Sequence, residues 1–223
     1  MSYRYSTKKL PKYINQILLP WLRRSNSLFQ DFLGFLLEIG RLKLLKRSGW
    51  IFSGVSAAQA ESIADHSFRT ALLTLFLCKN LERKGVQINT ERAVTMALLH
   101  DVVECFTHDI DRRVTSLGGK AMVQGKHNAE RNAVAKLSQK LGGLGDILED
   151  AWKRLETDES LEVQLIRMCD RVETTIQAFE YVLQGHRVEQ FHEFWQEAKI
   201  QKEKAPSELV ELLDQILDRL KTL

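Results

Sequence analysis

The sequence has few prolines, few cysteines and no long apolar run. Its 223 residues include three prolines, at positions 11, 20 and 206, so residues 21–205 carry no obligatory helix breaker. Apolar stretches such as Leu75–Cys78 are too short to span a bilayer. The stretch Ile17–Leu22, which a proline interrupts, is too short for a signal peptide. We therefore expect neither a membrane-spanning segment nor a secretory leader.

The cysteines and the charge balance exclude further classes of protein. Cys78, Cys105 and Cys169 are far apart, odd in number and set among apolar residues. They predict buried thiols in a reducing cytoplasm and not a disulfide framework. The 32 basic and 29 acidic residues leave a net charge of +3, which is too balanced to indicate a nucleic-acid partner. The glycines at 142, 143 and 145 lack the Lys and Ser/Thr of a phosphate-binding P-loop.

Helical periodicity predicts the fold class. Runs rich in Leu, Ala, Glu, Lys and Arg recur at helical spacing between glycines, and no stretch shows sustained strand alternation. We expect a single all-α domain, a helical bundle over residues 26–223, preceded by a basic arm or short helix over residues 1–25. The expected helices span residues 26–46, 62–84, 90–106, 119–141, 145–156, 160–184, 188–203 and 206–222.

Capping signals support these boundaries. Ser62 is followed three residues later by Asp65, as in a capping box. Thr90 precedes Glu91, which predicts an N-cap and then an acid in the first turn.

Ionisable residues occupy positions where a helix should be apolar. On a helix over 90–106, His100 shares a face with Ala93, Met96 and Ala97, and Asp101 lies beside other apolar residues. Glu104 follows one turn later. A buried carboxylate costs several kcal/mol, in order of magnitude, unless it is paired or binds a cation. A buried His–Asp hydrogen bond with an exposed glutamate explains the pattern equally well at this point.

Two other predicted helices contain residues that could complete a cluster. His66 lies near the start of one helix, and Asp170 lies in a strongly apolar stretch of another. A core histidine and a surface ion pair are the simpler interpretations. Two histidines and two carboxylates would nevertheless suit a divalent transition metal and leave positions open for water and substrate.

The set of His66, His100-Asp101 and Asp170, each on a predicted helix, resembles the HD-domain superfamily of metal-dependent phosphohydrolases. The segments around Arg47–Trp50, Glu61–Ser67 and Gln177–Tyr181 are similar to its branch of nucleoside 5′-monophosphate phosphatases (5′-deoxynucleotidase-like). The resemblance covers about residues 27–195. It implies a cytoplasmic enzyme of nucleotide metabolism that acts as a homodimer on a phosphomonoester.

The resemblance also implies a role for each residue of the motif. His66, His100, Asp101 and Asp170 would bind one divalent ion, which is Mn, Co, Fe, Zn or Ni. Glu104 would transfer a proton to or from the attacking water or the leaving nucleoside oxygen. Asp109 would be a second acid–base candidate or a sugar contact, and Arg47 would bind the phosphate, which suits its planar, charged fork.

The sequence departs from that branch at one position next to Arg47. Ser48 stands where some relatives place an aromatic residue beside the sugar, so a preference for deoxyribose is an open question.

Two alternatives to the monophosphatase remain open. One is an HD hydrolase for a longer-chain or signalling nucleotide, which would need more cationic contacts than Arg47 alone. The other is a non-catalytic helical module in which the basic arm binds nucleic acid or another protein.

Overall fold

The structure is a computed structural model that describes residues 26–222. The predicted basic arm, residues 1–25, lies outside the described residues. Within them the chain is helical, and the one β-type feature is an isolated bridge between Lys46 and Ser62. The all-α class predicted from the periodicity is therefore confirmed.

The elements follow one another in a simple order. They are α2 (Asn26–Ile39), a 3-10 turn η1 (Gly40–Lys43), α3 (Ser48–Phe52), α4 (Ile63–Arg83), α5 (Thr90–Leu99), α6 (Glu104–Thr107), α7 (Arg112–Leu141), η2 (Gly142–Leu144), α8 (Gly145–Thr157), α9 (Leu161–Leu183), η3 (Val188–Phe191), α10 (His192–Lys202) and α11 (Ser207–Leu220).

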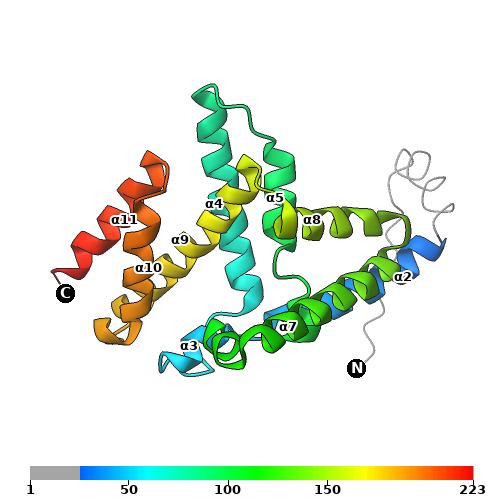
Figure 1. Cartoon of the computed structure of the whole chain (residues 1–223), viewed down its shortest axis with the longest axis horizontal. Helices are drawn as coiled ribbons and strands as arrows, with labels where there is room; N and C mark the ends of the chain where they lie inside the picture. The colour runs from blue at the N-terminus through cyan, green and yellow to red at the C-terminus, as the bar shows by residue number, and fades with distance from the viewer. Residues whose placement is uncertain (1–25, 223) are drawn as a thin grey trace, which may run out of the picture.

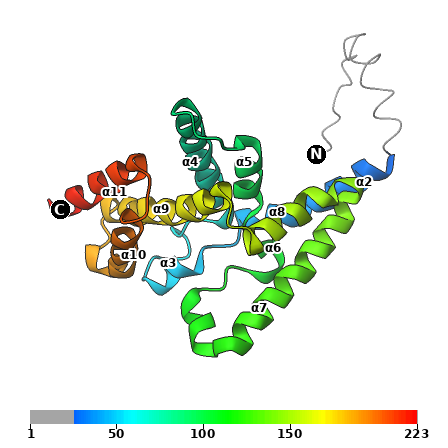
Figure 2. The ribbon, with the colours of Figure 1, turned by 45° about the horizontal axis from the view of Figure 1, so that its top comes forward.

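Three helices form the centre of the molecule. α4 packs against α5 and α9, and α5 also contacts α8 and α9. α10 and α11 cover one end of α9, whereas α7 runs along α2 and α8 at the other side (Figures 1 and 2). None of the helices within residues 26–222 has the length and apolar character needed to cross a bilayer.

The start of α4 confirms the predicted capping box. The Ser62 hydroxyl accepts a hydrogen bond from the Asp65 backbone N–H (3.1 Å), and the Asp65 carboxylate accepts one from the Ser62 N–H (2.9 Å). The predicted cap of α5 is one residue off. Asn89 caps this helix by accepting from the Arg92 N–H (2.9 Å), and Thr90 is the first helical residue.

The predicted continuous helix over 90–106 is wrong, because α5 ends at Leu99. The imidazole Nδ1 of His100 lies 2.8 Å from the carbonyl oxygen of Ala97 and so occupies an acceptor that helix continuation would use. The chain then makes turns in which N–H groups bond three residues back, such as Glu104 to Asp101 (3.0 Å). α6 begins at Glu104 after this tight segment.

Three further boundaries differ from the prediction. The first helix ends at Ile39 and continues as the 3-10 turn, and α3 was not expected at all. α7 begins at Arg112, seven residues before its predicted start, and bends at Gly119, where φ is 59° and ψ is −153°. Residues 188–191 form a 3-10 turn, not the first turn of α10.

Candidate metal centre

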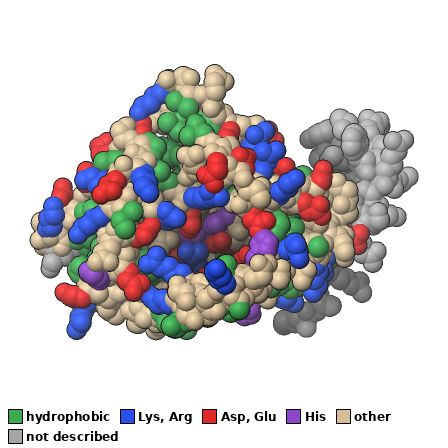
Figure 3. Space-filling view, in the orientation of Figure 1, with side chains coloured by type: hydrophobic (Ala, Val, Ile, Leu, Met, Phe, Trp, Pro, Cys, Tyr) green, Lys and Arg blue, Asp and Glu red, His purple; other side chains and the backbone are tan. Residues whose placement is uncertain are grey.

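A polar cavity of about 490 Å³ lies where five parts of the chain meet. Its walls come from the start of α3, the 101–111 segment, α7, α9 and α10. The charged lining residues are Arg47, Asp101, Glu104, Asp109, Asp111, Arg112, Arg113, Lys126, Asp170, Arg171, Glu193 and Glu197. Figure 3 shows a hollow near the centre of this face, in which acidic, basic and histidine side chains gather.

Four of the predicted site residues meet at the wall of this cavity, and two of them, Asp101 and Asp170, line it directly. Nε2 of His66 lies 3.0 Å from Oδ1 of Asp170 and 3.7 Å from Oδ2 of Asp101. Nε2 of His100 lies 3.3 Å from the same Asp101 oxygen and 3.4 Å from Nε2 of His66. The donors come from α4, the turn after α5, and α9.

Three of these residues are spaced as the ligands of one divalent ion are. Two ligands that bind one ion at about 2.1 Å are separated by about 3.0–3.4 Å in octahedral or tetrahedral geometry. The ligand atoms of His66, His100 and Asp101 all lie within 4.8 Å of one another, with spacings near this range. Asp170 is not part of that group, but its Oδ1 lies 3.0 Å from Nε2 of His66. Imidazole nitrogens with carboxylate oxygens are ligands that transition metals accept.

A second layer of polar groups holds His66 from behind. Its Nδ1 hydrogen-bonds Oε2 of Glu173, and neither side chain has exposed surface. Arg69 donates to the other Glu173 oxygen (2.9 Å) and also to Gln177 and Glu180. Glu61 lies in the same buried group, and it accepts a hydrogen bond from Trp50 Nε1 (2.7 Å). This layer fixes the imidazole so that Nε2 faces the cavity.

The electrostatics of the centre favour a positive charge. Burial disfavours the imidazolium, yet hydrogen bonds to Asp170 and Glu173 raise the pKa of His66 to about 10. Desolvation opposes the Asp170 carboxylate, but its bond to His66 holds the pKa of Asp170 well below the ordinary value. The raised pKa of His66 reports the carboxylates around it, whereas the lowered pKa of Asp170 reports the positive charge of His66 and Arg47 beside it. A cation bound at Nε2 of His66 would take the place of the proton that these carboxylates favour.

Arg47 lies beside the predicted ligands. It precedes α3, and its Nη1 is 3.2 Å from Oδ2 of Asp101. Burial works against its charge, but Asp101, Asp170 and Asp109 raise the pKa of Arg47 above its ordinary value. The guanidinium is therefore charged throughout the physiological range.

Glu104 is buried at the cavity wall, with 6% of its surface exposed. Its Oε2 has no hydrogen-bond partner among the residues that the structure describes. Burial, and then the nearby carboxylates of Asp101 and Asp109, raise the pKa of Glu104 well above that of an ordinary carboxyl group. The group is thus able to exchange a proton closer to neutral pH.

Asp109 lines the cavity but is held by α3. Its Oδ2 accepts hydrogen bonds from the Ser48 backbone N–H (2.6 Å) and hydroxyl (3.0 Å). The strained residue before it, His108 (φ 60°), turns the chain back toward Ser48. Asp109 therefore caps α3 and fixes the turn that carries Arg47.

Sequence reasoning missed several residues of this site. Glu173 follows Asp170 by three residues on the same face of α9, and that spacing was a signal that could have found it. Lys126 and Arg113 reach the cavity from α7, and neither was predicted to be a site residue. Phe194 also lines the cavity and stacks on Trp50, with ring centroids 4.5 Å apart.

Comparisons with known proteins show the family of the chain. A family model described as HD domain matches residues 39–211. A 5′-deoxynucleotidase HDDC2 of Dictyostelium discoideum is 32% identical over 162 residues, which are 71% of this chain and 82% of the relative.

Solved structures share the fold. A crystal structure of a Pyrococcus horikoshii OT3 protein has a TM-score of 0.67 and 31% identity, and the match covers 82% of this chain and 97% of that one. An HD-domain phosphohydrolase from Listeria innocua has a TM-score of 0.69 over 86% of this chain and 90% of its own, with 19% identity.

Proposed function

Because the chain belongs to the HD domain family, we propose that it is a metal-dependent phosphatase that releases phosphate from nucleoside 5′-monophosphates. The observation that carries the proposal is the meeting of two histidines with Asp101 and Asp170, two carboxylates that line the cavity together with Arg47. The naming of the similar relatives as 5′-deoxynucleotidases supports the substrate class.

The ligands of one divalent ion would be His66, His100, Asp101 and Asp170. The donor chemistry suits Mn, Co, Fe, Zn or Ni. When bound, such an ion lowers the pKa of a coordinated water toward neutrality and polarises a phosphoryl oxygen. Glu173 holds His66 in the tautomer that directs Nε2 toward the ion.

Arg47 would bind the phosphate of the substrate. Its fork can contact two phosphate oxygens, and its charge offsets that of the dianion. Asp109 supports this contact because it caps α3 through Ser48, directly after Arg47. Because Oδ2 of Asp109 already accepts these two hydrogen bonds, we assign Asp109 the role of positioning Arg47 and not that of transferring a proton.

Glu104 would carry the proton. Its buried, unpartnered oxygen and raised pKa suit a carboxyl group that protonates the leaving nucleoside oxygen. A glutamate that accepts a proton from the attacking water is the alternative, and the same residue serves both schemes.

We further propose that the protein works in the cytoplasm as a homodimer. All three cysteines are buried free thiols, which supports a reducing compartment. Phe68, Leu72 and Phe76 form an exposed apolar stripe on α4, with spacing of four residues and exposures of 64%, 37% and 68%. A second copy of the chain would cover this stripe.

The test is phosphate release from a panel of ribo- and deoxyribonucleoside mono-, di- and triphosphates. Metal-stripped protein is resupplied with each divalent ion, and Asp101→Asn serves as the control. We expect turnover of monophosphates only, restored by metal and lost in the variant. Turnover confined to longer phosphate chains would replace the proposed substrate, and no turnover with any ion would refute the enzymatic function.

A further inference from the structure

The buried face of α7 continues toward the cavity as two charged residues, of which Lys126 lines the cavity. Ala133, Leu137 and Leu141 of this face lie in the core. Going back along the helix at spacings of three and four residues, the same face carries Glu130 and then Lys126. Because the helix extends beyond the apolar cluster at that end, Lys126 reaches the cavity wall.

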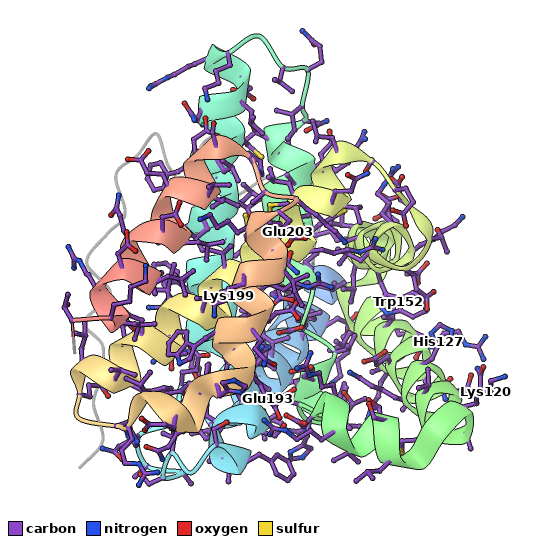
Figure 4. The ribbon with its side chains drawn as sticks, turned by 60° about the vertical axis from the view of Figure 1, so that its left-hand side comes forward. Lys120, His127, Trp152, Glu193, Lys199 and Glu203 are labelled. Carbon is purple, nitrogen blue, oxygen red and sulfur yellow. The ribbon has the colours of Figure 1, made fainter. Side chains whose placement is uncertain are left out.

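The rotation of α7 at this point is fixed by the next residue. The His127 ring stacks on Trp152 of α8, with centroids 5.6 Å apart, and its Nδ1 pairs with Glu156. Figure 4 shows His127 beside Trp152, whereas Lys120 lies next to the bend of α7 at Gly119. His127 therefore anchors α7 to α8, and Lys126 is directed to the cavity.

Two of the other cations at the cavity, Arg47 and Arg113, have shorter ion pairs than Lys126, whereas Arg112 and Arg171 pair loosely with Glu193 and Glu197 of α10 at 3.7–4.0 Å. Arg47 is bound to Asp101, and Arg113 is bound to Glu193 at 2.9 Å. Within residues 26–222, the ion pair of Lys126 is with Glu130 on its own helix, at 3.6 Å, which is long for a charge-assisted hydrogen bond. The Lys126 charge is nevertheless close enough to Glu104 to oppose, in part, the rise in the pKa of that carboxyl group.

The carboxyl groups near Arg47 outnumber its single positive charge, so a bound phosphate would need a further cation. Asp101, Glu104, Asp109 and Asp170 surround Arg47, so one guanidinium faces four carboxyl groups. A phosphate dianion that enters this cavity needs further positive charge beyond that of Arg47 and one metal ion.

We infer that Lys126 is a second phosphate-binding residue, whose ammonium group contacts the phosphate of the bound substrate together with Arg47. The inference deepens the proposed function and rests on it for the identity of the substrate. Lysine acts here as a point charge, which complements the two-pronged contact of the arginine.

The test measures binding of inorganic phosphate to the metal-loaded protein by isothermal titration calorimetry. It compares the wild type with Lys126→Gln and Lys126→Arg, and it uses Lys120→Gln as the matched control, because Lys120 is an exposed lysine of the same helix outside the cavity. Thermal unfolding of each variant verifies that it folds.

We expect Lys126→Gln to weaken phosphate binding by about 10- to 100-fold. Lys126→Arg should recover part of this loss, and Lys120→Gln should bind as the wild type does. The two products should also inhibit the Lys126→Gln variant differently. Inhibition by phosphate should weaken, whereas inhibition by the free nucleoside should not change.

Unchanged phosphate affinity in Lys126→Gln, or no phosphate binding by the wild type, would overturn the inference. An equal loss in Lys120→Gln would also overturn it, since a general charge effect would then be responsible. The nucleotide panel decides the proposed function separately. Phosphate binding that depends on Lys126 without turnover of any nucleotide would uphold this site and refute the phosphatase.

Discussion

A hydrogen bond joins Nδ1 of His66 to the carboxylate of Glu173, and both side chains are fully buried. The bond links the cavity to the interior, because Arg69 binds the other oxygen of the same carboxylate. The orientation of one predicted metal ligand thus depends on a residue that lies outside the cavity.

Replacement of Glu173 by Gln should weaken metal binding by about 10- to 100-fold, because the amide no longer holds His66 in one tautomer. Titration of metal-stripped protein with Mn²⁺ or Co²⁺ measures this loss. Glu180→Gln is the matched control, since Glu180 lies on the same helix as Glu173 and binds Arg69 without contacting His66. Equal affinities in the Glu173 variant and the wild type would exclude a positioning role for Glu173.

Loss of the Asp109 carboxylate should raise KM more than it lowers kcat. Asp109→Ala removes both bonds to Ser48 and frees the turn that carries Arg47. Ser48→Ala removes only the hydroxyl contact, so its effect should be smaller. Steady-state kinetics across pH provide the measurement. A large fall in kcat with loss of one limb of the pH profile would instead identify Asp109 as an acid–base residue.

Glu104→Gln should abolish most activity yet stabilise the metal-stripped protein at high pH. Proton transfer by a placed group contributes about 10²–10⁴ in rate, so kcat should fall by that order. Burial and neighbouring carboxylates raise the pKa of Glu104 in the folded state, so the ionised form costs stability once the pH exceeds the pKa of the unfolded chain. We expect a gain of about 1–2 kcal/mol at pH 8.

The gain should disappear near pH 4, where Glu104 is protonated in both the folded and the unfolded state. Urea unfolding of the variant and the wild type at the two pH values tests this sign. A stability difference that does not change with pH would mean that the ionised Glu104 is not penalised in the folded protein.

Charge placed in the α4 stripe should dissociate the proposed homodimer. Phe76→Glu puts a carboxylate on a side chain that is 68% exposed in the single chain. Size-exclusion chromatography with light scattering should then report the monomer mass in place of the dimer mass. Leu117→Glu is the control, because Leu117 is 91% exposed on α7, away from the stripe. If only the control dissociates, the interface lies elsewhere.

Local rules predicted much of the fold. The boundaries of α4 and α9 agree with the sequence to within one residue, because caps and apolar periodicity both act over a few residues. The positions of His66, His100, Asp101 and Asp170 also suited one cluster, and the structure brings their side chains together.

Other features depend on contacts that spacing does not encode. The end of α5 at Leu99 depends on the side chain of His100, and α3 depends on Asp109, some sixty residues away. Lys126 enters the cavity because α7 is anchored on α8 through His127 and Trp152. Such tertiary contacts override local preference, and an analysis of one helix at a time misses them.

The bend of α7 separates two parts of the cavity that can change independently. Gly119 adopts a backbone conformation that side chains strongly disfavour, so glycine acts here as a fixed joint. Residues 112–118, before Gly119, include Arg112 and Arg113, which line the cavity. The part of α7 after Gly119, which is anchored on α8, carries Lys126. A change in the length or charge of the 112–118 segment would therefore alter which molecules enter, while the cation that meets the phosphate stays in place. The two parts of α7 thus serve different roles: residues 112–118 influence which substrate enters, and Lys126 contacts its phosphate.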